Sequence, residues 1–249
     1  NYENLIPVLL TIDPGNRDIE RPNINLVVCF DVSGSMSSKL LVCKNILNTI
    51  CNVLSDGDTF TLFTFNHQTT LKFSRKMTPE NKEYCKTVID GIIATGGTNI
   101  SDCILGDDRG LDKLRENAAS ENGIILITDG YAHAGITQGS VLKSEIDTKI
   151  SDDFEYSFHS LGIGTSHCAK FLSDISPDYN FINDPVEISE VVGSILGDKI
   201  TPVVGKNVKL HLTGPPEEDT LPHTIESSDL ILLNNMRNDT KIPLVITYK

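Results

Sequence analysis

The sequence predicts an α/β fold of the Rossmann-like, doubly wound kind, with a mostly parallel sheet, one antiparallel edge strand and helices on both faces. Short apolar runs alternate with segments of helical periodicity, which is typical of parallel strands joined by right-handed crossovers. Two of these runs end in an aspartate, Asp31 and Asp129, and helical periodicity disappears after residue 201. The expected parts are an N-terminal strand, an α/β domain and a small C-terminal β appendage with which that strand pairs: residues 1–22, 23–200 and 201–249.

Two apolar runs near the start of the chain predict strands. Residues 5–12 have Pro7 near their beginning, which suits an edge strand because proline cannot donate a hydrogen bond to the ladder. Residues 26–30, Leu-Val-Val-Cys-Phe, form a short apolar run between Pro22 and Gly34. They predict a strand buried on both faces, as in the centre of a parallel sheet.

The segments up to residue 93 predict two helices and a hairpin. Residues 39–54 place apolar side chains at helical spacing on a single face. Residues 59–65 and 69–73 flank a tight turn, so the second run is the expected antiparallel edge. A helix begins at Thr78-Pro79 and extends to Ile93, with three side chains on one face: Tyr84, Val88 and Ile92.

The remaining elements continue the alternation. The glycines of the loop at residues 94–100 permit a close approach of the backbone to another group. Ser101 is expected to cap a helix that reaches Arg115 and is interrupted at residues 106–110. The elements expected after it are strand 123–128, helix 140–150, strand 154–163, helix 169–175, strand 179–182, helix 186–200, and strands 207–212, 230–233 and 242–248.

The composition narrows the class of partner. A hydrophobic content of 39% and a charged content of 22% are those of a globular protein, and no stretch has the length of a membrane helix. With 34 acidic against 21 basic residues, the formal net charge of −13 repels phosphate backbones and anionic lipids. We expect a protein partner, no nucleic acid and no membrane insertion, and the oligomeric state stays open.

The cysteines bear on the cellular location. They are scattered without zinc-site spacing, and several take apolar positions, where a free thiol acts as a small hydrophobic group. Together with the lack of an apolar signal region, this leads us to expect a cytoplasmic or nuclear protein. The six residues are Cys29, Cys43, Cys51, Cys85, Cys103 and Cys168.

Oxygen-bearing side chains gather at the predicted strand ends. Asp31 ends the central strand, and a glycine turn can aim the hydroxyls of Ser33 and Ser35 at the same point. Thr98 and Asp129 are expected at the same carboxyl edge, where open α/β sheets bind ligands. Hard oxygen donors suit Mg²⁺, Mn²⁺ or Ca²⁺. For residues 31–35 alone, capping of the following helix is the competing interpretation.

Three motifs in this order resemble a known site. Asp-Val-Ser-Gly-Ser at 31–35, Gly-Gly-Thr-Asn at 96–99 and Thr-Asp-Gly at 128–130 resemble an intact metal-ion-dependent adhesion site (MIDAS) of von Willebrand factor type A (VWA) domains. The resemblance covers roughly residues 23–200. The residues after the serines are more similar to the broad intracellular, bacterial and inter-α-trypsin-inhibitor-like branch than to integrins.

The resemblance implies a protein-interaction module that is not an enzyme. It implies Mg²⁺, with Mn²⁺ or Ca²⁺ as substitutes, held directly by the hydroxyls of Ser33 and Ser35 and joined by Thr98 directly or through water. Asp31 and Asp129 would act partly through bound waters. The open coordination position would take a Glu or Asp side chain of a partner protein, because few direct charges leave the ion enough positive character to attract it.

Two other functions remain open from the sequence. Asp31 could be the nucleophile of a Mg²⁺-dependent hydrolase or phosphotransferase, although Ser33 stands where such phosphatases have a second aspartate. The domain could also be a structural scaffold with a vestigial site. The six histidines lack the sequence context of a serine or cysteine nucleophile, so none is expected to be catalytic, and His133 is expected at the rim of the site.

Overall fold

The structure is a computed structural model of the 249-residue chain. The chain divides into two compact units, each described here by itself: Pro22–Ile200, and Asn1–Arg21 together with Thr201–Lys249. The described residues are 6–13, 19–150, 153–165, 167–184, 187–201, 203–205, 208–211, 230–233, 236–237 and 241–248.

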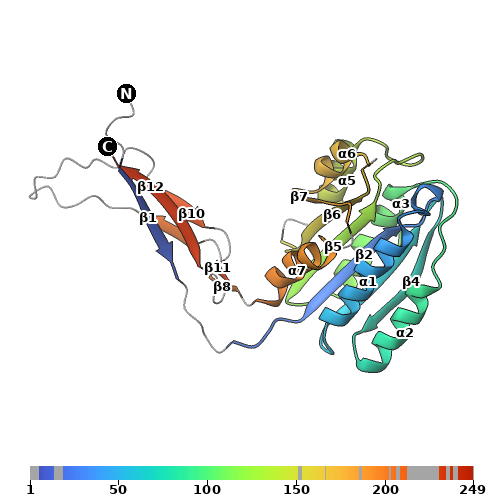
Figure 1. Cartoon of the computed structure of the whole chain (residues 1–249), viewed down its shortest axis with the longest axis horizontal. Coiled ribbons are helices and arrows are strands. Elements are labelled where there is room, and N and C mark those ends of the chain that lie inside the picture. The colour runs from blue at the N-terminus through green and yellow to red at the C-terminus, as the bar shows by residue number, and fades with distance from the viewer. Residues whose placement is uncertain are drawn as a thin grey trace, which may run out of the picture. The chain divides into compact units, whose positions relative to one another are not determined.

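A six-stranded sheet forms the centre of the larger unit (Figure 1). Its spatial order is β4-β3-β2-β5-β6-β7, and every neighbouring pair is parallel except β3 and β4. The order along the chain reverses between β2 and β5, so the carboxyl ends of these strands form the topological switch point, where ligands bind in such sheets. The strands are β2 (Ile24–Asp31), β3 (Thr59–Phe65), β4 (Thr69–Lys76), β5 (Glu121–Thr128), β6 (Ser157–Ile163) and β7 (Asp178–Ile182).

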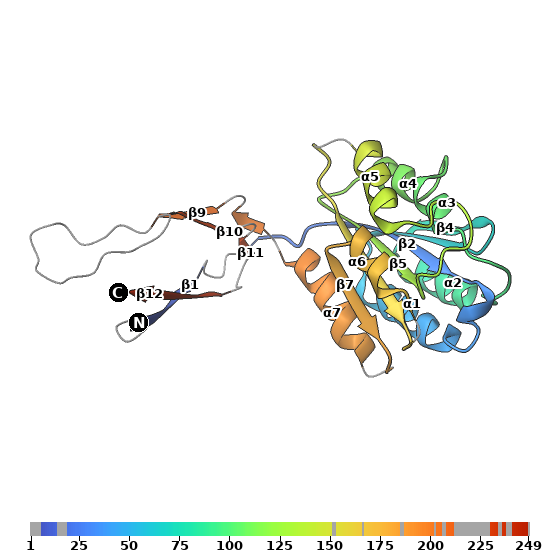
Figure 2. The same ribbon diagram turned by 90° about the horizontal axis from the view of Figure 1, so that it is seen from above.

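Helices cover both faces of this sheet, which confirms the predicted fold class (Figure 2). One face packs against α1 (Leu40–Val53), α2 (Pro79–Asp90) and α7 (Glu187–Ile200). The other packs against α3 (Ile100–Leu105), α4 (Gly110–Glu116), α5 (Gly139–Lys149) and α6 (Ala169–Ile175). None of the helices in the described part of the chain has the length and apolar character needed to cross a bilayer.

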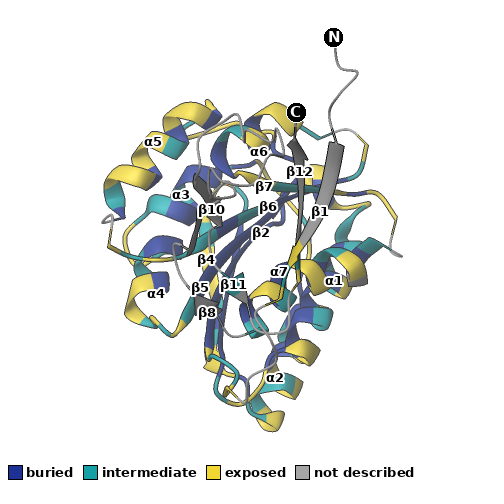
Figure 3. Ribbon diagram, turned by 90° about the vertical axis from the view of Figure 1, so that its left-hand side faces the viewer, coloured by how far each residue is buried: buried dark blue, intermediate teal, exposed yellow. Residues whose placement is uncertain are grey.

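The central strand shows why the sequence of β2 is almost entirely apolar. All its residues are buried, as the dark blue strands of the sheet in Figure 3 show. Val28 and Phe30 pack on the α1 side of the sheet, while Val27 and Cys29 pack on the other, because successive side chains point to opposite faces. At the edge, β4 has one buried residue, Phe73, and can therefore carry polar side chains.

Several local boundaries differ from the prediction. The second helix ends at Asp90 and not at Ile93, and its buried residues are Cys85 and Ile89. Tyr84 is 44% exposed, and its ring lies 4.3 Å from the guanidinium carbon of Arg75. Strand β6 begins at Ser157, three residues later than expected.

The helix after the glycine loop is interrupted as predicted, but its cap is a different residue. The side chain of Asn99, and not that of Ser101, accepts the N–H of Asp102 at 3.3 Å. The hydroxyl of Ser101 instead accepts the N–H of Ile136 at 3.0 Å. The break between α3 and α4 contains Asp108, which has φ +59°.

The smaller unit contains three antiparallel strand pairs among its described residues. Strands β1 (Ile6–Ile12) and β12 (Ile242–Tyr248) pair along their full length, so the N-terminal strand joins the C-terminal segment. The other pairs are β9 (Val208–His211) with β10 (Leu230–Leu233), and β8 (Val203–Gly205) with β11 (Met236–Arg237). The sequence pattern did not indicate β8 or β11, and residues 207 and 212 of the expected strand 207–212 lie outside the described residues.

Candidate functional site

Asp31 lies at the carboxyl end of β2 and has no solvent-accessible surface. Its Oδ1 accepts the N–H of Ser33 at 2.8 Å, and its Oδ2 accepts the hydroxyl of Thr128 at 2.6 Å. Burial raises the pKa of the Asp31 carboxyl from 3.8 to about 6, although both hydrogen bonds act to lower it. A buried carboxylate in this state is stabilised by a cation placed beside it.

Ser33 and Ser35 bring two hydroxyls together just after the strand. Their Oγ atoms lie 3.1 Å apart, with Ser33 buried and Ser35 exposed. Ser33 precedes a short 3-10 helix, Gly34–Met36, but its side chain makes no capping hydrogen bond, and neither does that of Lys39 at the start of α1. The competing interpretation, in which these hydroxyls cap a helix, is therefore wrong.

The loop before α3 brings Thr98 to the same end of the sheet. The N–H of Gly34 donates to the carbonyl of Gly96 at 2.9 Å, which ties this loop to the serine turn. Gly96 has φ +84°, and a Cβ there would lie 2.8 Å from Nδ1 of His67, so the position requires glycine. Thr98 is 1% exposed, and its Oγ1 is buried without a hydrogen-bond partner.

Asp129 follows β5 and is 1% exposed. Its Oδ2 lies 3.2 Å from Nζ of Lys39. In the turn that follows, the N–H groups of His133 and Ala134 both donate to the carbonyl of Thr98, at 2.9 and 3.1 Å. The aspartate turn is thus joined to the threonine loop, and His133 contacts the site through its backbone.

These side chains suit a hard divalent cation. They supply carboxylate and hydroxyl oxygens, the donors that Mg²⁺ and Ca²⁺ prefer. A buried hydroxyl without a partner, as at Thr98, costs about 1–3 kcal/mol, and a bound cation would give it one. No group of three His, Cys, Asp or Glu side chains in the described residues could hold a metal, so binding here depends on the hydroxyls. The donor residues are Asp31, Ser33, Ser35, Thr98 and Asp129.

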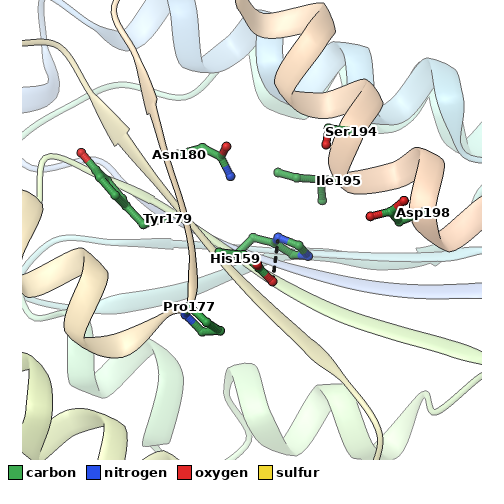
Figure 4. Close-up of a pocket in the computed structure, with 8 residues that line it drawn as sticks. His159, Pro177, Tyr179, Asn180, Ser194, Ile195 and Asp198 are labelled. Carbon is green, nitrogen blue, oxygen red and sulfur yellow. Dashed lines mark ion pairs between the residues drawn. The ribbon is translucent and has the colours of Figure 1, made fainter. Parts of the chain in front are cut away.

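A second candidate for a functional site is a cavity of about 280 Å³ near the amino ends of β6 and β7 (Figure 4). Nε2 of His159 lies 2.9 Å from Oγ of Ser157, and its Nδ1 lies 3.8 Å from Oδ2 of Asp178. The contacts from Ser157 through His159 to Asp178 follow the order of nucleophile, base and orienting acid in a hydrolase. The sequence context did not indicate this arrangement. However, 3.8 Å exceeds a hydrogen bond and Ser157 does not line the cavity, so we assign no catalysis to this cluster.

Sequence reasoning missed two contacts of the candidate site. The Thr128 hydroxyl, which donates to Asp31, also accepts the N–H of Gly130 at 2.9 Å. Its place in the Thr-Asp-Gly motif could have identified Thr128 as part of the site. The ion pair between Lys39 and Asp129 joins residues that are 90 positions apart, and nothing in the local pattern indicated it.

Comparison with known proteins relates part of the chain to a family. Residues 26–132 match the family model of the von Willebrand factor type A domain. Inter-alpha-trypsin inhibitor heavy chain H4 of Homo sapiens is 32% identical over 162 residues, and heavy chain H2 of Sus scrofa is 33% identical over 163 residues. Each match covers 62% of this chain and 17% of the relative, so the chain spans a small part of these proteins.

Solved structures share the fold at low sequence identity. A von Willebrand factor type A protein from Catenulispora acidiphila has a TM-score of 0.65 and 16% identity, covering 98% of this chain and 61% of that one. Proximal thread matrix protein 1 from the mussel byssus, with a zinc-occupied MIDAS motif, has a TM-score of 0.58 and 16% identity, covering 75% of this chain and 50% of that one. The stretch that matches the von Willebrand factor type A model, residues 26–132, contains all five residues of the candidate metal site, and the solved structures share its fold.

Proposed function

We propose that the chain contains a VWA domain that binds Mg²⁺ at a MIDAS and there captures a Glu or Asp side chain of a partner protein. The observation that carries the proposal is the buried, unpaired hydroxyl of Thr98. Backbone hydrogen bonds tie its loop to the serine turn and to the turn after Asp129. The two turns carry further oxygen donors. A cation bound among them would give the buried hydroxyl the partner that it lacks.

The residues of the site have different roles. The hydroxyls of Ser33, Ser35 and Thr98 would be neutral donors, and the carboxylates of Asp31 and Asp129 would supply negative charge. A cation held by this set provides a Lewis-acid position for an outside carboxylate. Zinc at the MIDAS motif of the mussel protein supports a divalent cation here, and Mn²⁺ or Ca²⁺ are expected substitutes for Mg²⁺.

Calorimetric titration of Mg²⁺ and Mn²⁺ into chelator-stripped protein tests the metal site. We expect saturable one-to-one binding that Asp31→Ala abolishes. Asp56→Ala is the matched control, because Asp56 is an exposed loop carboxylate and its loss should leave the affinity unchanged. Equal thermal stability in Mg²⁺ and in chelator would instead indicate a scaffold, because a ligand bound only by the folded state must raise stability.

Capture of a carboxylate is tested with acetate as the probe and acetamide as its neutral counterpart. Acetate should tighten Mn²⁺ binding to the wild-type protein, and acetamide should not, because only acetate brings a negative charge to the cation. Turnover of a generic phosphate ester that Asp31→Asn abolishes would replace this proposal with the hydrolase alternative.

A further inference from the structure

Lys39 places a fixed positive charge at the candidate metal site. Its Nζ lies 3.2 Å from Oδ2 of Asp129, and its side chain is 16% exposed. Gly164, with φ +79°, follows β6, and a Cβ there would lie 2.9 Å from Cε of Lys39. The glycine therefore allows the loop after β6 to pass close to the lysine side chain.

A cavity of about 320 Å³ lies beside this lysine. Lys39 is the one charged residue among those that line it, so an anion that enters the cavity meets a single positive charge. A lysine ammonium has three N–H donors, and the ion pair with Asp129 engages one of them. The other lining residues are apolar or neutral, among them Val42, Ile163, Ile182, Thr165 and Asn183.

Lys39 could act on the site through its charge or by positioning Asp129, and the contacts favour the charge. The carbonyl of Asp129 accepts the N–H of Cys168 at 2.8 Å, and its Oδ1 accepts the N–H of Tyr131 at 3.5 Å. The aspartate is also almost wholly buried at the end of β5. Its place is therefore set largely by the backbone, and what Lys39 adds is electrostatic.

We propose that Lys39 makes the site selective for anionic ligands. Its charge repels a divalent cation and attracts a carboxylate, so it weakens binding of the metal alone and strengthens binding of a carboxylate to the metal-loaded site. The whole chain has a net charge of −13, which repels an acidic partner. A local positive charge at Lys39 reduces this repulsion at the site. The inference rests on the proposed function, and it names the residue that selects the partner's charge.

Electron paramagnetic resonance of free Mn²⁺ tests this in titrations of chelator-stripped protein, with and without acetate. Lys39→Met should raise the affinity for Mn²⁺ alone about fivefold and reduce the tightening by acetate at least about fivefold. Lys39→Arg keeps the charge and should resemble the wild type. Lys44→Met is the matched control, because Lys44 lies in α1, the helix that directly follows Lys39, but donates to the carbonyl of Asp90.

The outcomes separate this inference from the function on which it rests. A wild-type protein that binds no Mn²⁺ overturns both. Mn²⁺ binding with the same acetate effect in Lys39→Met overturns the role of Lys39 alone. Weaker Mn²⁺ binding in Lys39→Met shows that the lysine positions Asp129, and this also overturns the proposal. Lys39→Gln repeats the test with a polar neutral side chain if the methionine variant does not fold.

Discussion

Asp31→Asn should stabilise the metal-free protein while removing its stabilisation by Mg²⁺. Asp31 is fully buried, and its carboxylate accepts hydrogen bonds from the N–H of Ser33 and the hydroxyl of Thr128. Asparagine has nearly the same shape and keeps an oxygen to accept the N–H of Ser33. It carries no charge to bury, so the metal-free fold gains stability and the metal site loses a charged donor.

The size of the stability gain in metal-free Asp31→Asn follows from the pKa of Asp31. Burial raises this pKa from 3.8 to about 6, and each pKa unit corresponds to about 1.36 kcal/mol, so ionised Asp31 costs roughly 3 kcal/mol of unfolding free energy. Loss of the bond from Thr128 offsets about 1 kcal/mol of this. The net gain of about 2 kcal/mol corresponds to a rise of about 4–8 °C in melting temperature for a domain of this size.

The gain should depend on pH in a defined direction. Because the folded-state pKa lies above the unfolded value, the folded protein holds more protons between pH 3.8 and about 6. Wild-type stability relative to the variant therefore falls as pH rises through this interval and is constant above it. The advantage of Asp31→Asn should disappear near pH 4, where Asp31 is protonated in the folded protein, and be complete near pH 7.

Urea unfolding of the wild type and Asp31→Asn is measured at pH 4, 5.5 and 7.5, in chelator and in Mg²⁺. It reports the gain in stability, its dependence on pH and the loss of stabilisation by Mg²⁺. Asp56→Asn serves as a control for the removal of an exposed carboxylate. A variant that is less stable than the wild type at pH 7.5 in chelator would refute the reasoning. A stability difference that stays constant from pH 4 to 7.5 would refute it too.

Three further predictions concern residues near the metal site and at His159. Thr98→Val removes an unpaired buried hydroxyl that costs about 1–3 kcal/mol, so it should not destabilise the metal-free protein in thermal melts. Calorimetry should show weaker Mg²⁺ binding in this variant and near wild-type binding in Thr98→Ser. Gly96→Ala should cost about 1–2 kcal/mol in urea unfolding because of its φ of +84°, whereas Gly97→Ala, whose Cβ would meet no atom within 4 Å, should cost less. Burial lowers the pKa of His159 from 6.5, so the folded state resists its protonation and stability should fall as pH drops below about 6.5. His159→Asn should flatten that slope, and an unchanged slope would rule out His159 as its source.

The parts of the fold that could be predicted are those that local physics decides. A strand buried on both faces has no solvent-facing position, so β2 is almost entirely apolar, and its short run with β-branched residues favoured a strand over a helix. The alternation of strands and helices then indicated a mostly parallel sheet, in which the ends of the strands before Asp31 and Asp129 lie at one edge. The site residues followed from their positions at strand ends and in a glycine loop.

The incorrect predictions concern segments whose sequence suits two local arrangements equally well. Asn99 and Ser101 both suit a helix cap, and the contact of Ser101 with Ile136, which is remote in sequence, decides between them. The second helix carries two adjacent apolar stripes, and packing selected Cys85 and Ile89 over Tyr84. A cytoplasmic or nuclear location stays a prediction, which the six free thiols motivated.

Stability and metal binding oppose each other at this site, and that opposition separates a binding module from a scaffold. The metal-free domain keeps a buried carboxylate at Asp31 and an unpaired hydroxyl at Thr98, each at a cost that is a sizeable share of the about 5–15 kcal/mol by which domains are stable. Asparagine and valine would remove these costs with little change in shape. A cation removes them as well, because it pairs both groups at once. If the site serves only structure, the two substitutions should stabilise the protein and Mg²⁺ should not; if it binds a cation, wild-type protein in Mg²⁺ should recover the stability that the variants gain without it.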